Sequence, residues 1–184
     1  SSISDKTVVV FGASGFLGSH VADALSGAGY QVRLFDHISS PYQRIDQEMI
    51  VGDIMDIDQV IEATRGAYAV YNFAAIADID EAHNKPIATA TINVLGNMHV
   101  LEAARIAGAN RFVFASSVYV YSESGSFYRA SKQAAERFTE TYHDRYGLDY
   151  TILRYGSLYG RRADLRNGIY RMLHEAIQKH SITY

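Results

Sequence analysis

Short apolar runs alternate along the chain with longer stretches in which apolar residues recur at helical spacing. The runs predict six strands, at 7–11, 31–36, 48–53, 67–75, 111–116 and 149–155. The amphipathic stretches predict helices at 16–28, 57–65, 87–107, 127–146 and 168–179. This alternation, with right-handed crossovers, is typical of an α/β fold: a doubly wound, Rossmann-type parallel sheet flanked by helices. No repeat, low-complexity tract or linker divides residues 1–184, so we expect one domain.

Composition and charge narrow the class of protein. The 184 residues are 48% apolar and 20% charged, as in ordinary globular domains, and the net charge of −3 favours neither nucleic acid nor an anionic membrane as a partner. The chain has no cysteine, and its seven histidines lack the paired spacing of a helical metal site. No apolar run reaches transmembrane length, and the first residues lack a signal-peptide pattern. We therefore expect a soluble, cytoplasmic protein without a metal.

A glycine-rich loop, GASGFLG, joins the first predicted strand to the first predicted helix. Gly12 permits a tight turn, Gly15 lets the backbone approach a pyrophosphate, and Gly18 lets helix and strand pack closely. Free amides at the helix start, where Phe16 and Leu17 lie, then face the phosphates. Glycines in a βα turn can also be purely structural. In this strand–loop–helix context, the loop predicts a dinucleotide-binding site.

An acidic residue, Asp36, ends the second predicted strand. A carboxylate at this place accepts hydrogen bonds from both ribose hydroxyls and repels a 2′-phosphate, which favours NAD over NADP. Arg33 and Arg44 are too distant in sequence to reverse that preference. The alternative is that Asp36 is a surface turn residue.

A tyrosine and a lysine stand one helical turn apart in the helix predicted at 127–146. The i, i+4 spacing places Tyr128 and Lys132 on the same helix face. A nearby ammonium lowers the pKa of a phenol from about 10 toward neutral, where a general acid–base is most effective. Because the chain has fourteen tyrosines, a single pair can also arise by chance.

Taken in order, the motifs resemble the extended short-chain dehydrogenase/reductase superfamily, in its NAD-dependent epimerase/dehydratase family. The resemblance covers essentially all 184 residues. Besides the glycine loop, it is carried by GDI (52–54), NFAAIAD (72–78), TINVLGN (91–97), FASSVYVYS (114–122), YRASK (128–132) and LRYGSLYG (153–160). Each motif is weak by itself, and their shared order and spacing make the resemblance specific.

The resemblance implies an NAD-dependent enzyme and assigns roles to individual residues. Tyr128 would be the acid–base, Lys132 would hold the nicotinamide ribose and lower the tyrosine pKa, and Ser117 would bind the reacting sugar oxygen. The alternative for Ser117 is that it only satisfies the backbone at the strand end, as we expect of Ser116. The cofactor-binding residues implied are Gly12, Gly15, Phe16, Leu17, Gly18, Asp36, Asp53, Ile54, Phe73, Ala74, Ala75, Asn93, Tyr128, Lys132 and Tyr155.

Departures from the family pattern narrow the reaction. Val118 and Tyr119 stand where 4,6-dehydratases carry Asp and Glu, so epimerisation or simple oxidation and reduction are favoured. The short connection SESGS (122–126) indicates a more open pocket, and Ser157 replaces an asparagine near the substrate diphosphate. We expect an NAD-dependent nucleotide-sugar epimerase or related sugar oxidoreductase. Two alternatives stay open: an NAD(P)-dependent reductase of a small carbonyl compound, and a non-catalytic dinucleotide-binding regulator or scaffold.

Substrate contacts and assembly are less determined by the sequence. Relatives continue into a C-terminal lobe that holds the nucleotide and sugar, and we expect this substrate lobe to be largely absent, since the chain ends at SITY as a further strand begins. The cations Arg161, Arg162 and Arg166 would steer a phosphate or form a solvated cluster. In relatives the two long helices, here 87–107 and 127–146, form a dimer interface, which predicts a homodimer unless they only cover the sheet. The apolar or aromatic residues expected there are Leu95, Val100, Phe138 and Tyr142.

Overall fold

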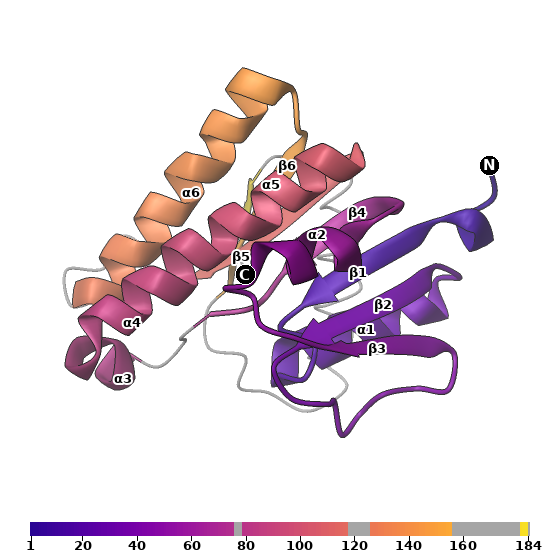
Figure 1. The fold of residues 1–184 in the computed structure, drawn as a ribbon, viewed down its shortest axis with the longest axis horizontal. Coiled ribbons are helices and arrows are strands. Elements are labelled where there is room, and N and C mark those ends of the chain that lie inside the picture. Colours follow the sequence, from indigo (N-terminus) through magenta and orange to yellow (C-terminus); the bar gives the residue numbers. More distant parts are fainter. Residues whose placement is uncertain (76–78, 118–125, 156–180, 184) are drawn as a thin grey trace.

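A parallel sheet with helices on both faces organises the chain (Figure 1). The computed structural model describes residues 1–75, 79–117, 126–155 and 181–183. The strand order is β3-β2-β1-β4-β5-β6-β7, and every neighbouring pair is parallel. The strands are β1 (Thr7–Phe11), β2 (Gln31–Asp36), β3 (Gln47–Val51), β4 (Ala67–Asn72), β5 (Arg111–Ser117), β6 (Tyr150–Tyr155) and β7 (Ser181–Thr183). The order reverses between β1 and β4, where doubly wound sheets form their binding crevice.

The helices follow the expected alternation. They are a 3₁₀ turn (Ile3–Asp5), α1 (Phe16–Gly27), α2 (Ile57–Thr64), α3 (Ile79–Asn84), α4 (Pro86–Ala90), a π-helical segment η2 (Thr91–Gly96), α5 (Asn97–Ala107) and α6 (Ser126–Tyr146). Gly108 and Gly147 follow α5 and α6 with φ of 68° and 73°, the left-handed conformation that ends a helix. Among the described residues, no helix is both long and apolar enough to cross a bilayer, and no group of three or more acidic or histidine side chains could hold a metal ion.

Alternating side chains of the central strands divide the core into two layers. On one face Val8 and Val10 of β1 pack with residues of α1, such as Val21. On the other face Val9 and Phe11 pack with residues of α2 and α5. Because both faces of β1 are buried, its sequence is a continuous apolar run rather than an alternating one.

Some strands end earlier than expected, at positions where a polar side chain bonds to the backbone and starts a turn. The strand expected at 67–75 ends at Asn72, whose Oδ1 accepts a hydrogen bond of 3.0 Å from the amide of Ala74. That local bond competes with the strand pattern and starts the turn. The helix α3 was not expected, since its residues, IDEAHN, are largely polar. The helix expected at 168–179 lies outside the described residues.

The long helix expected at 87–107 is interrupted. Pro86 begins α4, six residues (Thr91–Gly96) form a π-helical segment, and α5 continues from Asn97. Two asparagines are buried here, Asn93 within the π-helical segment and Asn97 directly after it, each 1% exposed. Single π turns of this kind are frequent at functional sites.

Candidate active site

The glycine-rich loop lies at the carboxyl end of β1. Gly12 has a φ of 75°, and its amide donates to the carbonyl of Phe35 at 3.0 Å. A Cβ at Gly12 would lie 2.5 Å from the backbone nitrogen of Ala74, and one at Gly18 would overlap the carbonyl oxygen of Gly12. Both glycines are therefore required by the fold.

Gly15 differs from the other two glycines of the loop. Its φ of −77° and ψ of 168° suit any residue, and a Cβ there would meet nothing closer than the Gly12 oxygen, at 3.4 Å. Gly15 is also the N-cap of α1, where backbone amides are unpaired by the helix. The fold alone does not demand glycine at this position, whereas a phosphate approaching the amides would.

Asp36 holds this loop to the end of β2. Its Oδ2 accepts a hydrogen bond of 2.9 Å from the amide of Ser14, and its Oδ1 accepts one of 2.7 Å from the amide of His37. The Nδ1 of His37 also lies 2.7 Å from Oδ1. The Asp36 side chain is only 12% exposed, so it is a built part of the loop rather than a surface turn residue.

A cavity of about 570 Å³ opens beside the loop. Eight of the expected cofactor-binding residues line it: Gly12, Gly15, Asp36, Asp53, Ile54, Phe73, Ala74 and Ala75. The other lining residues, which the sequence reasoning missed, are Ser14, Phe35, His37, Ile38, Gly52, Glu81 and Ile92. Ser14, His37 and Gly52 stand next to recognised motif residues in the sequence, and that position could have revealed them. Glu81 and Ile92 belong to helices that reach the cavity only through the tertiary fold.

Asp53 shapes the wall of the cavity after β3. Its amide donates to Oε1 of Gln59 at 2.8 Å, and its Oδ1 accepts from the amide of Met55 at 2.9 Å. The next residue, Ile54, is buried and its carbonyl lies 2.9 Å from Nδ1 of His99 on α5. These bonds anchor the turn between β3 and α2 to the helix layer.

Asn93 is buried and does not belong to the residues that line the cavity. Its Nδ2 donates to Oγ of Ser131 at 3.0 Å, and Ser131 in turn donates to the carbonyl of Tyr128 at 2.8 Å. Phe16 is 58% exposed at the start of α1, and Leu17 packs on the α1 side of the core. For Tyr155, the structure describes the backbone at the end of β6 but not the side chain.

Tyr128, Lys132 and Ser117 come together where α6 crosses the carboxyl end of β5. All three are buried, with exposed fractions of 3–4%. Burial raises the pKa of the Tyr128 phenol, and a hydrogen bond with Ser117 opposes that rise. Ser117 therefore contacts Tyr128 directly, which favours the expected pairing over a purely backbone role.

The expected effect of Lys132 on the tyrosine is wrong for this structure. The Lys132 ammonium donates to the carbonyl of Ala115 at 2.9 Å and lies 4.8 Å from the ring centroid of Phe114. Burial lowers the pKa of Lys132 to about 8, and the charge of Glu136 opposes that shift. Burial therefore raises the pKa of Tyr128 above its ordinary value, and the ammonium, which bonds to β5, does not reverse that rise.

Several expected features lie outside the described residues. They are Val118, Tyr119, the connection 122–125, Ser157, and the cations Arg161, Arg162 and Arg166. Ser116 is described and fully buried, but among the described residues its Oγ has no hydrogen-bond partner. Among the residues that the structure describes, the hydrogen bond that we expected of Ser116 is therefore not found.

The fold and the cavity define a dinucleotide-binding α/β domain, and comparison with known proteins gives its family. The sequence profile of the NAD dependent epimerase/dehydratase family matches residues 8–184, and the chain belongs to this family. The chain is 31% identical over 176 residues to a putative UDP-glucose 4-epimerase of Methanocaldococcus jannaschii. The aligned region covers 85% of this chain and 57% of that protein. The chain thus spans little more than half the length of this relative.

Solved structures that share the fold include two UDP-glucose 4-epimerases. The UDP-glucose 4-epimerase of Thermotoga maritima, solved with UDP-glucose, matches with a TM-score of 0.77 and 28% identity, over 85% of this chain and 57% of that one. The UDP-glucose 4-epimerase of Thermus thermophilus, solved as a complex with NAD, matches with a TM-score of 0.77 and 31% identity over the same shares, 85% and 57%.

Proposed function

We propose that residues 1–184 are the NAD-binding and catalytic part of a nucleotide-sugar epimerase. The observation that carries the proposal is the meeting of two sites at one edge of the sheet. The cavity beside Gly15 and Asp36 lies at the carboxyl ends of β1 to β4, and the Tyr128–Ser117 pair lies at the carboxyl end of β5, the next strand. This is the edge where doubly wound sheets bind ligands.

The residues of the cavity fit NAD. Gly15 leaves space above the amides at the start of α1, where a pyrophosphate is stabilised by unpaired N–H groups. Asp36 lines the cavity with a carboxylate, which suits ribose hydroxyls and disfavours a 2′-phosphate. Asp53 and Ile54 would line the adenine end, as the family resemblance implies.

Three side chains would carry the chemistry. When bound, NAD supplies a hydride acceptor that later returns the hydride. Tyr128 would take the proton of the sugar hydroxyl and give it back, while Ser117 holds the reacting oxygen. Lys132 would hold the nicotinamide ribose with an ammonium that is charged at neutral pH, because its pKa is about 8.

The substrate proposal has a separate basis. The relative and the two structures described above are named as UDP-glucose 4-epimerases, and one of the structures holds UDP-glucose. Since the chain spans only about 57% of each, both the activity and the sugar nucleotide are inferred for the gene product as a whole.

A screen of the full-length gene product with UDP-, GDP- and dTDP-sugars tests the function. We expect the sugar to change without net accumulation of NADH, and Tyr128→Phe to serve as the inactive control. Accumulation of NADH would instead indicate a dehydrogenase, and turnover only of small aldehydes or ketones would indicate a carbonyl reductase. Tight NAD binding with no turnover of either class would favour a non-catalytic regulator.

We also propose a cytoplasmic homodimer formed through the helical stretch 87–107, which comprises most of α4 with η2 and α5, and through α6. Leu95 and Phe138 support it, since they are 44% and 37% exposed at the helix surfaces. Val100 was wrongly expected there: it is fully buried in the core, because its side of α5 faces the sheet. Tyr142 is half-buried and donates to Glu102 at 2.7 Å, which joins the two helices within one subunit.

A further inference from the structure

A buried carboxylate lies one helical turn beyond Lys132. Glu136 is fully buried on α6, and its Oε1 accepts a hydrogen bond of 2.7 Å from Nε of Arg154 on β6. Its second oxygen, Oε2, has no hydrogen-bond partner among the described residues. Burying an ionised carboxylate costs free energy unless nearby cations or hydrogen-bond donors compensate its charge. The buried position of Glu136 therefore needs a reason beyond packing.

The surroundings place this charge pair next to the candidate site. Arg154 is in register with Ser116 of β5, so its side chain leaves the sheet on the same face as Ser116. Lys132 bonds to the neighbouring carbonyl of Ala115, and the i, i+4 spacing puts Lys132 and Glu136 on the same face of α6. The buried ammonium of Lys132, whose charged form Glu136 favours, and the guanidinium of Arg154, whose side chain is 19% exposed, therefore share one buried carboxylate.

We propose that Glu136, held in place by Arg154, is a positioning residue that keeps the Lys132 ammonium charged and turned toward β5 at neutral pH. The effect of Glu136 on Lys132 does not depend on the proposed function. Its consequence for catalysis rests on that function. The physical reason is that burial of Lys132 disfavours its charged form, whereas a nearby carboxylate favours it. The lowered pKa of Lys132 already contains both effects, with burial the larger and Glu136 opposing it.

Other charged groups near α6 are unsuited to this role. Tyr128 is neutral at neutral pH, since burial raises its pKa. β5 contributes alcohols and carbonyls here, and His83 of α3 lies beside Ser126, more than a turn before Lys132. On the α5 side, Glu102 and Arg105 pair with each other near the far end of α6. Among the described residues, Glu136 is the carboxylate placed to act on Lys132.

The test follows the titration of Lys132 itself, by ¹⁵N NMR of the lysine side chains in the 184-residue chain, with Lys132→Met to assign the signal. Glu136→Gln removes the negative charge and keeps the shape, and we expect the midpoint of Lys132 to fall by about one pH unit. If Glu136 were only structural, its loss would loosen the packing and admit water, and the midpoint would rise toward the ordinary lysine value. An unchanged or raised midpoint would overturn the proposal.

Two further variants keep the test decisive. Arg154→Gln keeps a hydrogen-bond donor toward Glu136 but removes the positive charge that competes with Lys132 for the carboxylate. The midpoint of Lys132 should therefore rise, opposite in sign to Glu136→Gln, and a fall would contradict the proposal. Glu136→Asp keeps the charge but withdraws it by one methylene, so the midpoint should fall by less than with Gln. If the Gln variant does not fold, the Asp variant decides: a fall supports the proposal, and no change or a rise overturns it.

The consequence for the site is measured separately, by titrating NAD against pH with fluorescence. In the unmodified chain we expect affinity to weaken as pH rises through about 8, and in Glu136→Gln the weakening should begin at lower pH. If the NMR midpoint moves and the binding profile does not, Glu136 does not position Lys132 for the cofactor. Failure of the unmodified chain to bind NAD would reject the proposed function, while the NMR arm would still decide the effect of Glu136 on Lys132.

Discussion

At the residue scale, the proton transfer assigned to Tyr128 can be separated from cofactor binding. Tyr128→Phe removes the phenol, which pairs with Ser117, and changes little shape. We expect turnover of the full-length gene product to fall by about 10²–10⁴-fold, the usual contribution of a general acid–base, with NAD binding nearly intact. Lys132→Met should damage both quantities, and Ser117→Ala should lower turnover by a smaller factor. Near-normal turnover in Tyr128→Phe would show that the tyrosine is structural.

The glycine loop offers a matched pair of substitutions. Gly15→Ala should leave the free energy of unfolding within about 1 kcal/mol, because the new methyl meets no close atom of the protein and the backbone suits alanine. It should nevertheless weaken NAD binding, since the methyl occupies the space of the pyrophosphate. Gly12→Ala is the control and should unfold the chain more easily, because of the left-handed φ and the contact with Ala74. Undiminished NAD binding in Gly15→Ala would place the phosphates elsewhere.

Asp36 bears on the choice between cofactors. Its carboxylate lines the cavity and would face the 2′-phosphate of NADP, so we expect NAD to bind more tightly. Asp36→Asn removes the charge while keeping an acceptor for the amide of Ser14. The substitution should therefore reduce the preference for NAD over NADP without disrupting the glycine-rich loop. Parallel fluorescence titrations with NAD and NADP measure this preference. Equal or tighter binding of NADP to the unmodified chain would contradict the assignment.

At the scale of elements, the buried Lys132 makes the packing of α6 on β5 depend on pH. The pKa of Lys132 is about 8 in the folded chain and about 10.4 in an unfolded one. Between these values the unfolded state binds more protons, so the free energy of unfolding rises with pH in this window. Below about pH 8 both states are protonated, and the cost of burying the ammonium is fully present.

Lys132→Met isolates this effect, because both chains share every other titrating group. From pH 7.5 to 10, the stability of the unmodified chain relative to Lys132→Met should increase by on the order of 2–3 kcal/mol. Urea unfolding of both chains at several pH values measures the difference. A difference that stays constant across the window would mean that Lys132 is solvated rather than buried.

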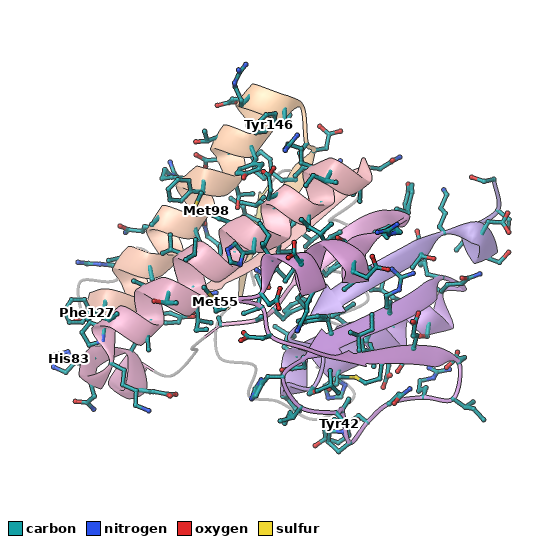
Figure 2. All side chains as sticks on the ribbon, viewed as in Figure 1. Tyr42, Met55, His83, Met98, Phe127 and Tyr146 are labelled. Carbon is teal, nitrogen blue, oxygen red and sulfur yellow. The ribbon has the colours of Figure 1, made fainter. Side chains whose placement is uncertain are left out.

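At the scale of the whole molecule, the exposed faces of α5 and α6 should bring two copies together. Figure 2 shows Phe127 and Tyr146 at opposite ends of α6 and Tyr42 on the loop after β2, far from these helices. Phe138→Glu should convert the dimer to a monomer, because it places a charge in an apolar interface. Tyr42→Glu, at a residue that is 59% exposed, is the matched control and should leave the dimer intact. A clean monomer of the unmodified chain by light scattering at micromolar concentration would reject the dimer for this chain.

The sequence by itself determined the elements whose signals are local. Buried strands appear as apolar runs, so β1 and β2 match the expected ranges residue for residue. Gly108 and Gly147 marked the ends of α5 and α6, because glycine adopts a left-handed φ without steric cost. The carboxyl ends of parallel strands meet at one edge, so the grouping of the glycine loop with Asp36 also followed from the order of elements.

The tertiary structure alone decided the properties that depend on distant neighbours. Asn93 is buried within the π-helical turn, where its amide donates to Ser131 of α6, and the pattern of apolar residues in TINVLGN does not predict that turn. The Glu136–Arg154 pair joins residues 18 positions apart in sequence, through a partly buried contact between α6 and β6. Spacing correctly placed Tyr128 and Lys132 on one face, but the direction of each pKa shift follows from desolvation and partner atoms, which only the packed fold supplies.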